Sequence, residues 1–286
     1  MTAEFWIIQA FNGLSYGALL FLLASGLSLI FGVMRIVNLA HGSYFMLGGY
    51  VGLSVVWRTE SFPAAVLAGA VAVGLIGMGM ERLFLRRLPG QTLGQVLMTI
   101  GFALIFQDLA LLIWGGDPYT IPVPGALQGS VVAGTYSFPS YRIFIVVVAV
   151  AVGALLWLAL DRTRAGARIR AAVDDREMAQ GVGINVPVIS LAVFALGACL
   201  AALGGVIGGA FLGVYPGADF EVLPYAFVVV IVGGLGSLPG AMVGSLLVGL
   251  LDNFGKALFP ELSYFTLFAP MALILALKPT GLFGRA

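Results

Sequence analysis

Residues 161–187, DRTRAGARIRAAVDDREMAQGVGINVP, form the longest polar stretch of the chain and separate two strongly apolar segments. They hold five of the fourteen basic residues. Burying an Arg or Asp at the centre of a membrane helix costs roughly 2.5–3.5 kcal/mol, so this loop must lie in water, and its arginines favour the cytoplasmic side. Residues 171–180 are predicted to form a short helix that ends at Gly181 and Gly183. Such a helix, projecting from a membrane bundle, suits contact with a soluble partner.

The composition on either side of this loop is that of a membrane protein. Of the 286 residues, 60% are hydrophobic and only 9% are charged, whereas soluble domains carry about 25% charged residues. We therefore predict an all-α polytopic membrane protein with a single transmembrane domain over residues 1–286. The net charge of +1 gives no indication of a nucleic acid partner. The single cysteine, Cys199, excludes a disulfide framework within the chain.

Glycine is over-represented, with 40 residues in 286, about twice the usual ~7%. Small residues four apart let membrane helices approach closely. The pattern recurs at Gly13/Gly17, Gly48/Gly52, Gly205/Gly209/Gly213 and Gly240/Gly244. We expect tightly packed helices, several of them interrupted.

About eight transmembrane helices are predicted from the apolar runs. They cover residues 5–32, 42–57, 62–80, 93–114, 141–160, 188–212, 241–258 and 265–277, with a further short run at 225–232. A helix break at residues 38–42 and a glycine-rich interruption at 233–240 predict broken or re-entrant segments, because irregular backbone at membrane depth must be covered by protein or water. Residues 115–140 contain no Lys or Arg and predict an extended connection outside the membrane.

The basic residues divide unevenly between the two sides of this arrangement. Eleven fall on one side: Arg35, Arg82, Arg86, Arg87, Arg162, Arg164, Arg168, Arg170, Arg176, Lys278 and Arg285. Three fall on the other: Arg58, Arg142 and Lys256. The excess of Lys and Arg in cytoplasmic loops then predicts an outside N-terminus and a cytoplasmic C-terminus.

Three stretches resemble a known family. FGVMRIVNLAHGSYFMLGGYVG (31–52), RAAVDDREMAQGVGI (170–184) and GGLGSLPGAMVGSLLVG (233–249) are similar to the LivH-type permeases of bacterial branched-chain amino acid ABC importers. The resemblance covers essentially the whole chain. It implies a multi-pass protein of the bacterial inner membrane that contacts lipid, a second homologous permease, two ATPase subunits that bind ATP and Mg²⁺, and a solute-binding receptor. Relatives in the family import urea, short amides or aromatic acids, so those solutes remain alternatives to branched-chain amino acids.

The same resemblance implies a coupling helix in the polar loop that transmits ATPase closure to the bundle. Its motif falls on Ala172, Asp174, Asp175, Glu177, Ala179, Gly183 and Ile184. Gly183 would allow the chain to turn sharply at the end of this helix. Ile184 would hold the turn in place through apolar contacts. The alternative is an ordinary cytoplasmic loop whose acids balance its arginines.

Other candidates lie at the two interruptions. Asn38 and His41 are three residues apart and share a face if they are helical, with Gly42 directly after. They either satisfy backbone groups that a helix break leaves open or take part in a gate or translocation path. One histidine without a neighbouring acid or thiol does not indicate a metal site. In the second interruption, Gly234 and Gly236 would line a pore or contact an ATPase.

Ionisable residues within the spans complete the candidates. Asp252 and Lys256 are spaced i,i+4 and can pair. Asp108 has no cation near it in the sequence and is a functional candidate by default. Asp219 and Glu221 are predicted, together with Arg58 and Arg142, to be rim charges that meet a receptor or end helices in solvent.

No catalytic or nucleotide-binding motif occurs. The only Gly-Lys pair, Gly255–Lys256, is not part of a G-x-x-x-x-G-K-[ST] phosphate loop. The chain is therefore expected to bind no cofactor and to have no ATPase site of its own. A self-sufficient channel or ion-coupled carrier is the rival from another class.

Overall fold

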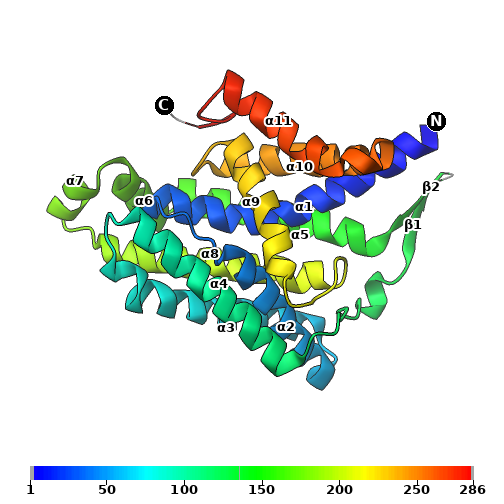
Figure 1. Ribbon diagram of the computed structural model, residues 1–286, viewed down its shortest axis with the longest axis horizontal. Coiled ribbons are helices and arrows are strands. Elements are labelled where there is room, and N and C mark those ends of the chain that lie inside the picture. The colour runs from blue at the N-terminus through cyan, green and yellow to red at the C-terminus, as the bar shows by residue number, and fades with distance from the viewer. Residues whose placement is uncertain (1–2, 135, 285–286) are drawn as a thin grey trace.

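The computed structural model describes residues 3–134 and 136–284, and nearly all of its regular structure is helical (Figure 1). Its helices are α1 Ala3–Met34, α2 His41–Thr59, α3 Phe62–Leu83, α4 Thr92–Trp114, α5 Ser140–Arg162, α6 Arg164–Asp174, α7 Arg176–Gly181, α8 Val186–Gly209, α9 Ala218–Gly233, α10 Leu238–Leu258 and α11 Ser263–Leu277. Short 3-10 turns are η1 Leu85–Arg87, η2 Gly125–Leu127 and η3 Pro260–Leu262. The prediction of an all-α polytopic membrane protein is confirmed.

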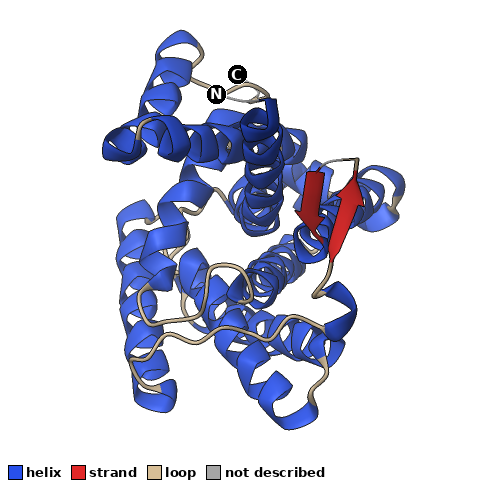
Figure 2. Cartoon of the chain, turned by 90° about the vertical axis from the view of Figure 1, so that its right-hand side faces the viewer, coloured by secondary structure: helices blue, strands red, loops and turns tan. Residues whose placement is uncertain are grey.

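Six helical segments of the described chain are long and apolar enough to cross a membrane: Ala3–Met34, Phe62–Arg87, Thr92–Trp114, Ser140–Arg162, Val186–Gly209 and Leu238–Leu258. Each segment predicted as a span falls on one of the helices. The described residues of the connection between α4 and α5 are non-helical apart from η2 and contain an antiparallel hairpin, β1 Ser130–Ala133 with β2 Tyr136–Pro139. Figure 2 shows this hairpin at the side of the helical bundle.

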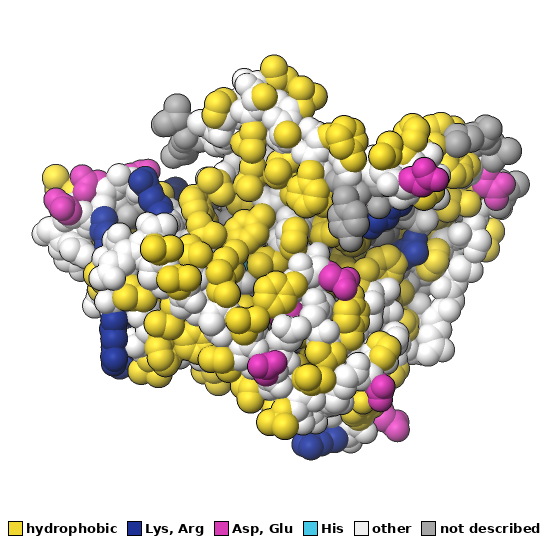
Figure 3. Space-filling model, in the orientation of Figure 1, with side chains coloured by type: hydrophobic (Ala, Val, Ile, Leu, Met, Phe, Trp, Pro, Cys, Tyr) yellow, Lys and Arg dark blue, Asp and Glu magenta, His cyan; other side chains and the backbone are white. Residues whose placement is uncertain are grey.

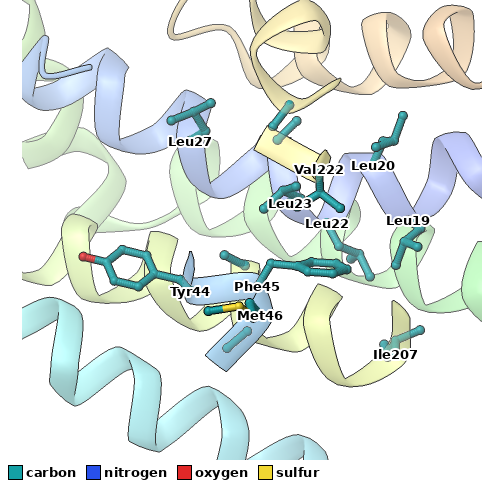
Figure 4. Packing of buried hydrophobic residues seen from close by; sticks show 14 of the residues in the cluster. Leu19, Leu20, Leu22, Leu23, Leu27, Tyr44, Phe45, Met46, Ile207 and Val222 are labelled. Carbon is teal, nitrogen blue, oxygen red and sulfur yellow. The ribbon is translucent and has the colours of Figure 1, made fainter. Parts of the chain in front are cut away.

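Helix α1 is the central element of the bundle. Its 32 residues are unbroken and span about 48 Å at 1.5 Å per residue, more than the ~30 Å membrane core. It contacts α10, α8, α5 and α9. Figure 4 shows leucines of α1 packed with Phe45 and Met46 of α2, Ile207 of α8 and Val222 of α9.

Glycines set the distances between the inner helices. A Cβ added to Gly48 of α2 would lie 2.4 Å from Ala202 Cα of α8. One added to Gly17 of α1 would lie 2.6 Å from Ser245 O of α10. The helices therefore pack backbone to backbone, as the glycine pattern predicts.

Helices α2 and α9 begin inside the bundle, not at its surface. After α1 ends, residues 35–38 are irregular and α2 starts at His41. Helix α9 starts at Ala218 after the loop 210–217. The two first turns meet, because a Cβ on Gly42 would lie 2.3 Å from Asp219 O. The bundle thus contains two helices, of 19 and 16 residues, whose N-termini converge.

Candidate functional site

The polar stretch 161–187 folds as two helices and not as one. The prediction of a single helix over residues 171–180 is wrong, because the chain is extended at Asp175 (φ −149°, ψ 105°) between α6 and α7. The Asp175 carboxylate Oδ1 accepts a hydrogen bond of 2.9 Å from the backbone N–H of Met178. An aspartate that caps a new helix competes with continuation of the previous one.

Two alanines of this segment lie inside and its acids outside. Ala172 and Ala179 are buried together with Val186, and Ile184 packs against them. Asp174 and Glu177 are exposed, as are the apolar side chains of Val173, Met178 and Val182. The exposed acidic and apolar side chains, above the buried alanines, form a surface that another protein can bind.

The chain turns sharply after α7, and this turn depends on Gly183. Its φ of +86° is in the left-handed region, which favours glycine. This turn lets the N–H of Ile184 donate to Ala179 O at 3.0 Å. The segment is therefore compact, and Figure 1 shows α6 and α7 at one end of the bundle.

An ion pair that the sequence did not reveal lies at the end of the polar stretch. Arg86 donates to both carboxylate oxygens of Glu81, at 3.2 and 2.9 Å, and to Pro187 O at 3.0 Å. Glu81 is 2% exposed. The pair joins the end of α3 to the start of α8, directly after the polar stretch.

We expect Arg86→Ala to lower the free energy of unfolding by roughly 2 kcal/mol, because it leaves the buried Glu81 carboxylate without its partner. Arg87→Ala is the matched control, since Arg87 is a neighbouring exposed arginine, and its change should stay within ~0.5 kcal/mol. Thermal denaturation of the two purified variants in detergent measures the difference. Equal melting temperatures would contradict the role of the pair.

A second polar group lies where α2 and α9 meet. Ser43 Oγ donates to Asp219 Oδ2 at 2.7 Å, and Asp219 is 2% exposed. Its carboxylate is in the first turn of α9 and next to the first turn of α2, where helix dipoles favour negative charge. The prediction of Asp219 as a solvated rim charge is wrong. The sequence placed the apolar run only from residue 225, so the first turns of α9 were missed.

Asn38 and His41 are both fully buried beside this junction. Asn38 Oδ1 accepts from the N–H of Ala40 at 3.1 Å, and His41 Nε2 lies 2.9 Å from Leu23 O of α1. They do not share a helix face, because Asn38 precedes α2. Asn38 thus bonds a backbone group within the interruption before α2, whereas His41 contacts a carbonyl inside the unbroken helix α1. Among the described residues there is no group of three or more His, Cys, Asp or Glu that could hold a metal ion.

The second interruption, at 233–240, is covered by the end of the chain. Gly234 and Gly236 have φ of +107° and +78°. The N–H groups of Leu282 and Phe283 donate to Val232 O and Gly233 O, each at 2.9 Å. Protein thus satisfies carbonyls that the end of α9 leaves open.

The remaining ionisable candidates differ in their partners. Lys256 bonds Asp252 at 2.8 Å, which confirms that predicted pair. Arg142 donates to Asn12 and lies 5.0 Å from the centre of the Phe211 ring, so it is not a free rim charge. Asp108 is exposed on α4, and the structure gives it no ion pair with a described residue.

Glu221, next to the junction, remains on the surface. It accepts a hydrogen bond of 2.6 Å from the Tyr215 hydroxyl. Burial raises the pKa of Tyr215, in the loop before α9, to about 12, and the bond to Glu221 adds to this shift. Tyr215 is therefore a neutral donor at physiological pH.

Comparison with known proteins extends over almost the whole chain. A family model described as "Branched-chain amino acid transport system / permease component" matches residues 9–277. The high-affinity branched-chain amino acid transport system permease protein BraD of Pseudomonas aeruginosa is 32% identical over 299 residues, covering 98% of this chain and 96% of that protein. LivH of Escherichia coli K12, of the same description, is 29% identical over 298 residues, with the same coverage. The ribose import permease RbsC of Escherichia coli K12 is 27% identical over 299 residues, covering 95% of this chain and 84% of that protein. No solved structure matches the chain.

Proposed function

The chain belongs to the family of branched-chain amino acid transport system permease components, and from this premise we propose that it is the membrane-spanning subunit of an ABC importer for a small polar solute. Branched-chain amino acids are the first candidate solutes, because BraD and LivH carry that description. The ribose permease RbsC is also related, so the family scaffold does not by itself select the solute. Selectivity then resides mainly in a solute-binding receptor, since the spans offer few polar groups.

The observation that carries the proposal is the surface formed by α6 and α7. At one end of the bundle, its acids and some of its apolar side chains are exposed, while two of its alanines are buried beneath them. This chain has no phosphate-binding loop, and in this proposal the energy comes from partner ATPases that bind ATP and Mg²⁺. We assign residues 172–184 to their docking surface. Closure of the ATPases would push on α7 and, through Arg86 and Pro187, on α3 and α8.

The orientation follows from the basic residues. The proposal places α6 and α7 in the cytoplasm, the N-terminus outside, and the whole in the inner membrane of a bacterium, next to a second homologous permease. Arg285, one of the basic residues that support this orientation, lies outside the described residues. The receptor would dock on the opposite face, where Arg58 and Glu221 are exposed.

An ion-coupled carrier is less well supported. Such a carrier needs paired or repeated ionisable groups on its pathway. The bond to Lys256 gives Asp252 a local structural role, and Asp108 is then a single exposed acid and not a member of such a pair. Uptake that continued in the purified chain alone, without ATP, would favour the carrier.

Reconstitution with the ATPases, the second permease and the receptor tests the proposal. We expect the double variant Asp174→Ala/Glu177→Ala to lose receptor-stimulated ATP turnover about tenfold, which is within the usual 1–3 kcal/mol of coupling between sites. Asp161→Ala is the matched control, because Asp161 is an exposed acid that lies outside residues 172–184. Unchanged stimulation in the double variant would remove the assignment of α7. Competition of the uptake by amino acids, urea and aromatic acids identifies the solute.

A further inference from the structure

The outward face of α4 has the spacing of a helix–helix seam. Leu97, Gly101, Leu104, Asp108 and Leu111 follow one another at intervals of four and three residues, the repeat that keeps one stripe against a partner helix. Three of them, Leu97, Leu104 and Leu111, are 60%, 49% and 50% exposed. A Cβ added to Gly101 would meet nothing within 4 Å. This stripe is therefore uncovered in the single chain.

The exposed stripes of the other outer helices are different. On α3 the stripe consists of Leu67, Val71 and Leu75, and no charged residue occurs in residues 62–80. On α5, Val147, Val150 and Leu155 are exposed, and residues 143–160 carry no charge. Both faces suit lipid tails. The face of α4 alone among these three carries a carboxylate.

The depth of Asp108 makes lipid an unsuitable neighbour. Asp108 lies six residues before Trp114, about 9 Å along the helix axis. Trp114 stacks on Tyr50 with ring centres 4.8 Å apart, and Trp57 contacts Tyr119 at 5.2 Å. Aromatic side chains of this kind mark the membrane–water interface. The Asp108 carboxylate is thus below that interface, where contact with hydrocarbon is costly.

The start of α9 borders the same face. Gly217 lies next to Gln107, since a Cβ on it would be 3.5 Å from Gln107 Nε2. Phe220 is exposed a few residues further on. Figure 3 shows the side of the molecule that carries α4 and α9 as broadly hydrophobic, with acidic side chains within it. Within the described chain α4 packs chiefly against α2, which leaves this face free for another protein.

We propose that the α4 stripe centred on Asp108 packs against a second, non-identical permease chain of the same family, and that this chain presents a hydrogen-bond donor or a cation to Asp108. The inference rests on the proposed function, which requires a second permease. A second copy of this chain fits poorly. Two parallel α4 helices related by a two-fold axis place the same residue on both sides of the contact, so two carboxylates would meet in one apolar seam.

Site-specific photo-cross-linking in native membranes tests the proposal. A photoreactive phenylalanine analogue replaces Leu104 or Leu111 in the tagged full-length chain, with Leu67 of α3 and Leu155 of α5 as matched exposed controls. We expect the two α4 positions to form a covalent adduct with a homologous permease of different sequence, identified by its peptides. The control positions should yield none.

Three outcomes overturn the proposal: no protein adduct from α4, an equal adduct from α3 or α5, or an adduct with a second copy of this chain.

The assay with Asp174 and Glu177 variants is independent of this result. If those variants lose coupling while the α4 positions form no adduct, the interface is wrong and the importer function stands. If coupling is unaffected while the α4 adduct forms, the two permeases pair through α4 but the role of α7 is wrong.

Discussion

Replacement of Gly205 by alanine is expected to cause the largest loss of stability among single substitutions in this chain. A Cβ at this position of α8 would lie 1.8 Å from Phe45 O and 2.7 Å from Phe45 C of α2. Both are backbone atoms, which cannot rotate away as a side chain can. Overpacking of a core costs typically 1–3 kcal/mol, and here we expect more than about 3 kcal/mol because two central helices must separate. That is a large part of a total stability of about 5–15 kcal/mol.

Size-exclusion chromatography and thermal denaturation in detergent measure this effect. Gly79→Ala is the matched control, because Gly79 is also helical and its added Cβ would meet nothing within 4 Å. The control should melt at or slightly above the parent temperature, since alanine restricts the unfolded chain. A Gly205→Ala protein that elutes and melts like the control would show that α2 and α8 do not pack as closely as described.

Asp219→Ala is expected to produce the second largest loss. The substitution removes a hydrogen bond to a charged group, worth about 1.5–3 kcal/mol. It also removes a negative charge from two converging helix N-termini, worth up to about 2 kcal/mol in a partly buried site. We therefore expect a destabilisation of roughly 3 kcal/mol, together with loss of solute uptake because α2 and α9 no longer hold their relative position.

A double-mutant cycle with Ser43→Ala isolates the contact. The two residues share one hydrogen bond, so their effects should be non-additive by about 1–3 kcal/mol. Glu221→Ala serves as control, because Glu221 is an exposed acid of the same first turn. Additive effects of Asp219→Ala and Ser43→Ala would contradict the junction.

The sequence predicted the fold class well, because long apolar runs and glycine spacing report directly on membrane helices and their packing. It did not predict the burial of Asp219, since a charged residue before an apolar run resembles a helix end in solvent. Nor did it predict the break at Asp175, where side-chain capping outweighs the helical preference of the flanking alanines. The Glu81–Arg86 pair was missed because its burial depends on α8, more than one hundred residues later.

The glycine contacts between α1 and α10 have a consequence for how the protein can change shape. A Cβ on Gly249 would lie 2.5 Å from Gly13 O, and one on Gly17 would lie 2.6 Å from Ser245 O. A slide of either helix by one residue would bring a side chain against the opposing backbone. We therefore expect α1 and α10 to move together as one unit, so that any change of shape in the bundle would have to occur elsewhere, for example at the irregular segments 35–40 and 210–217.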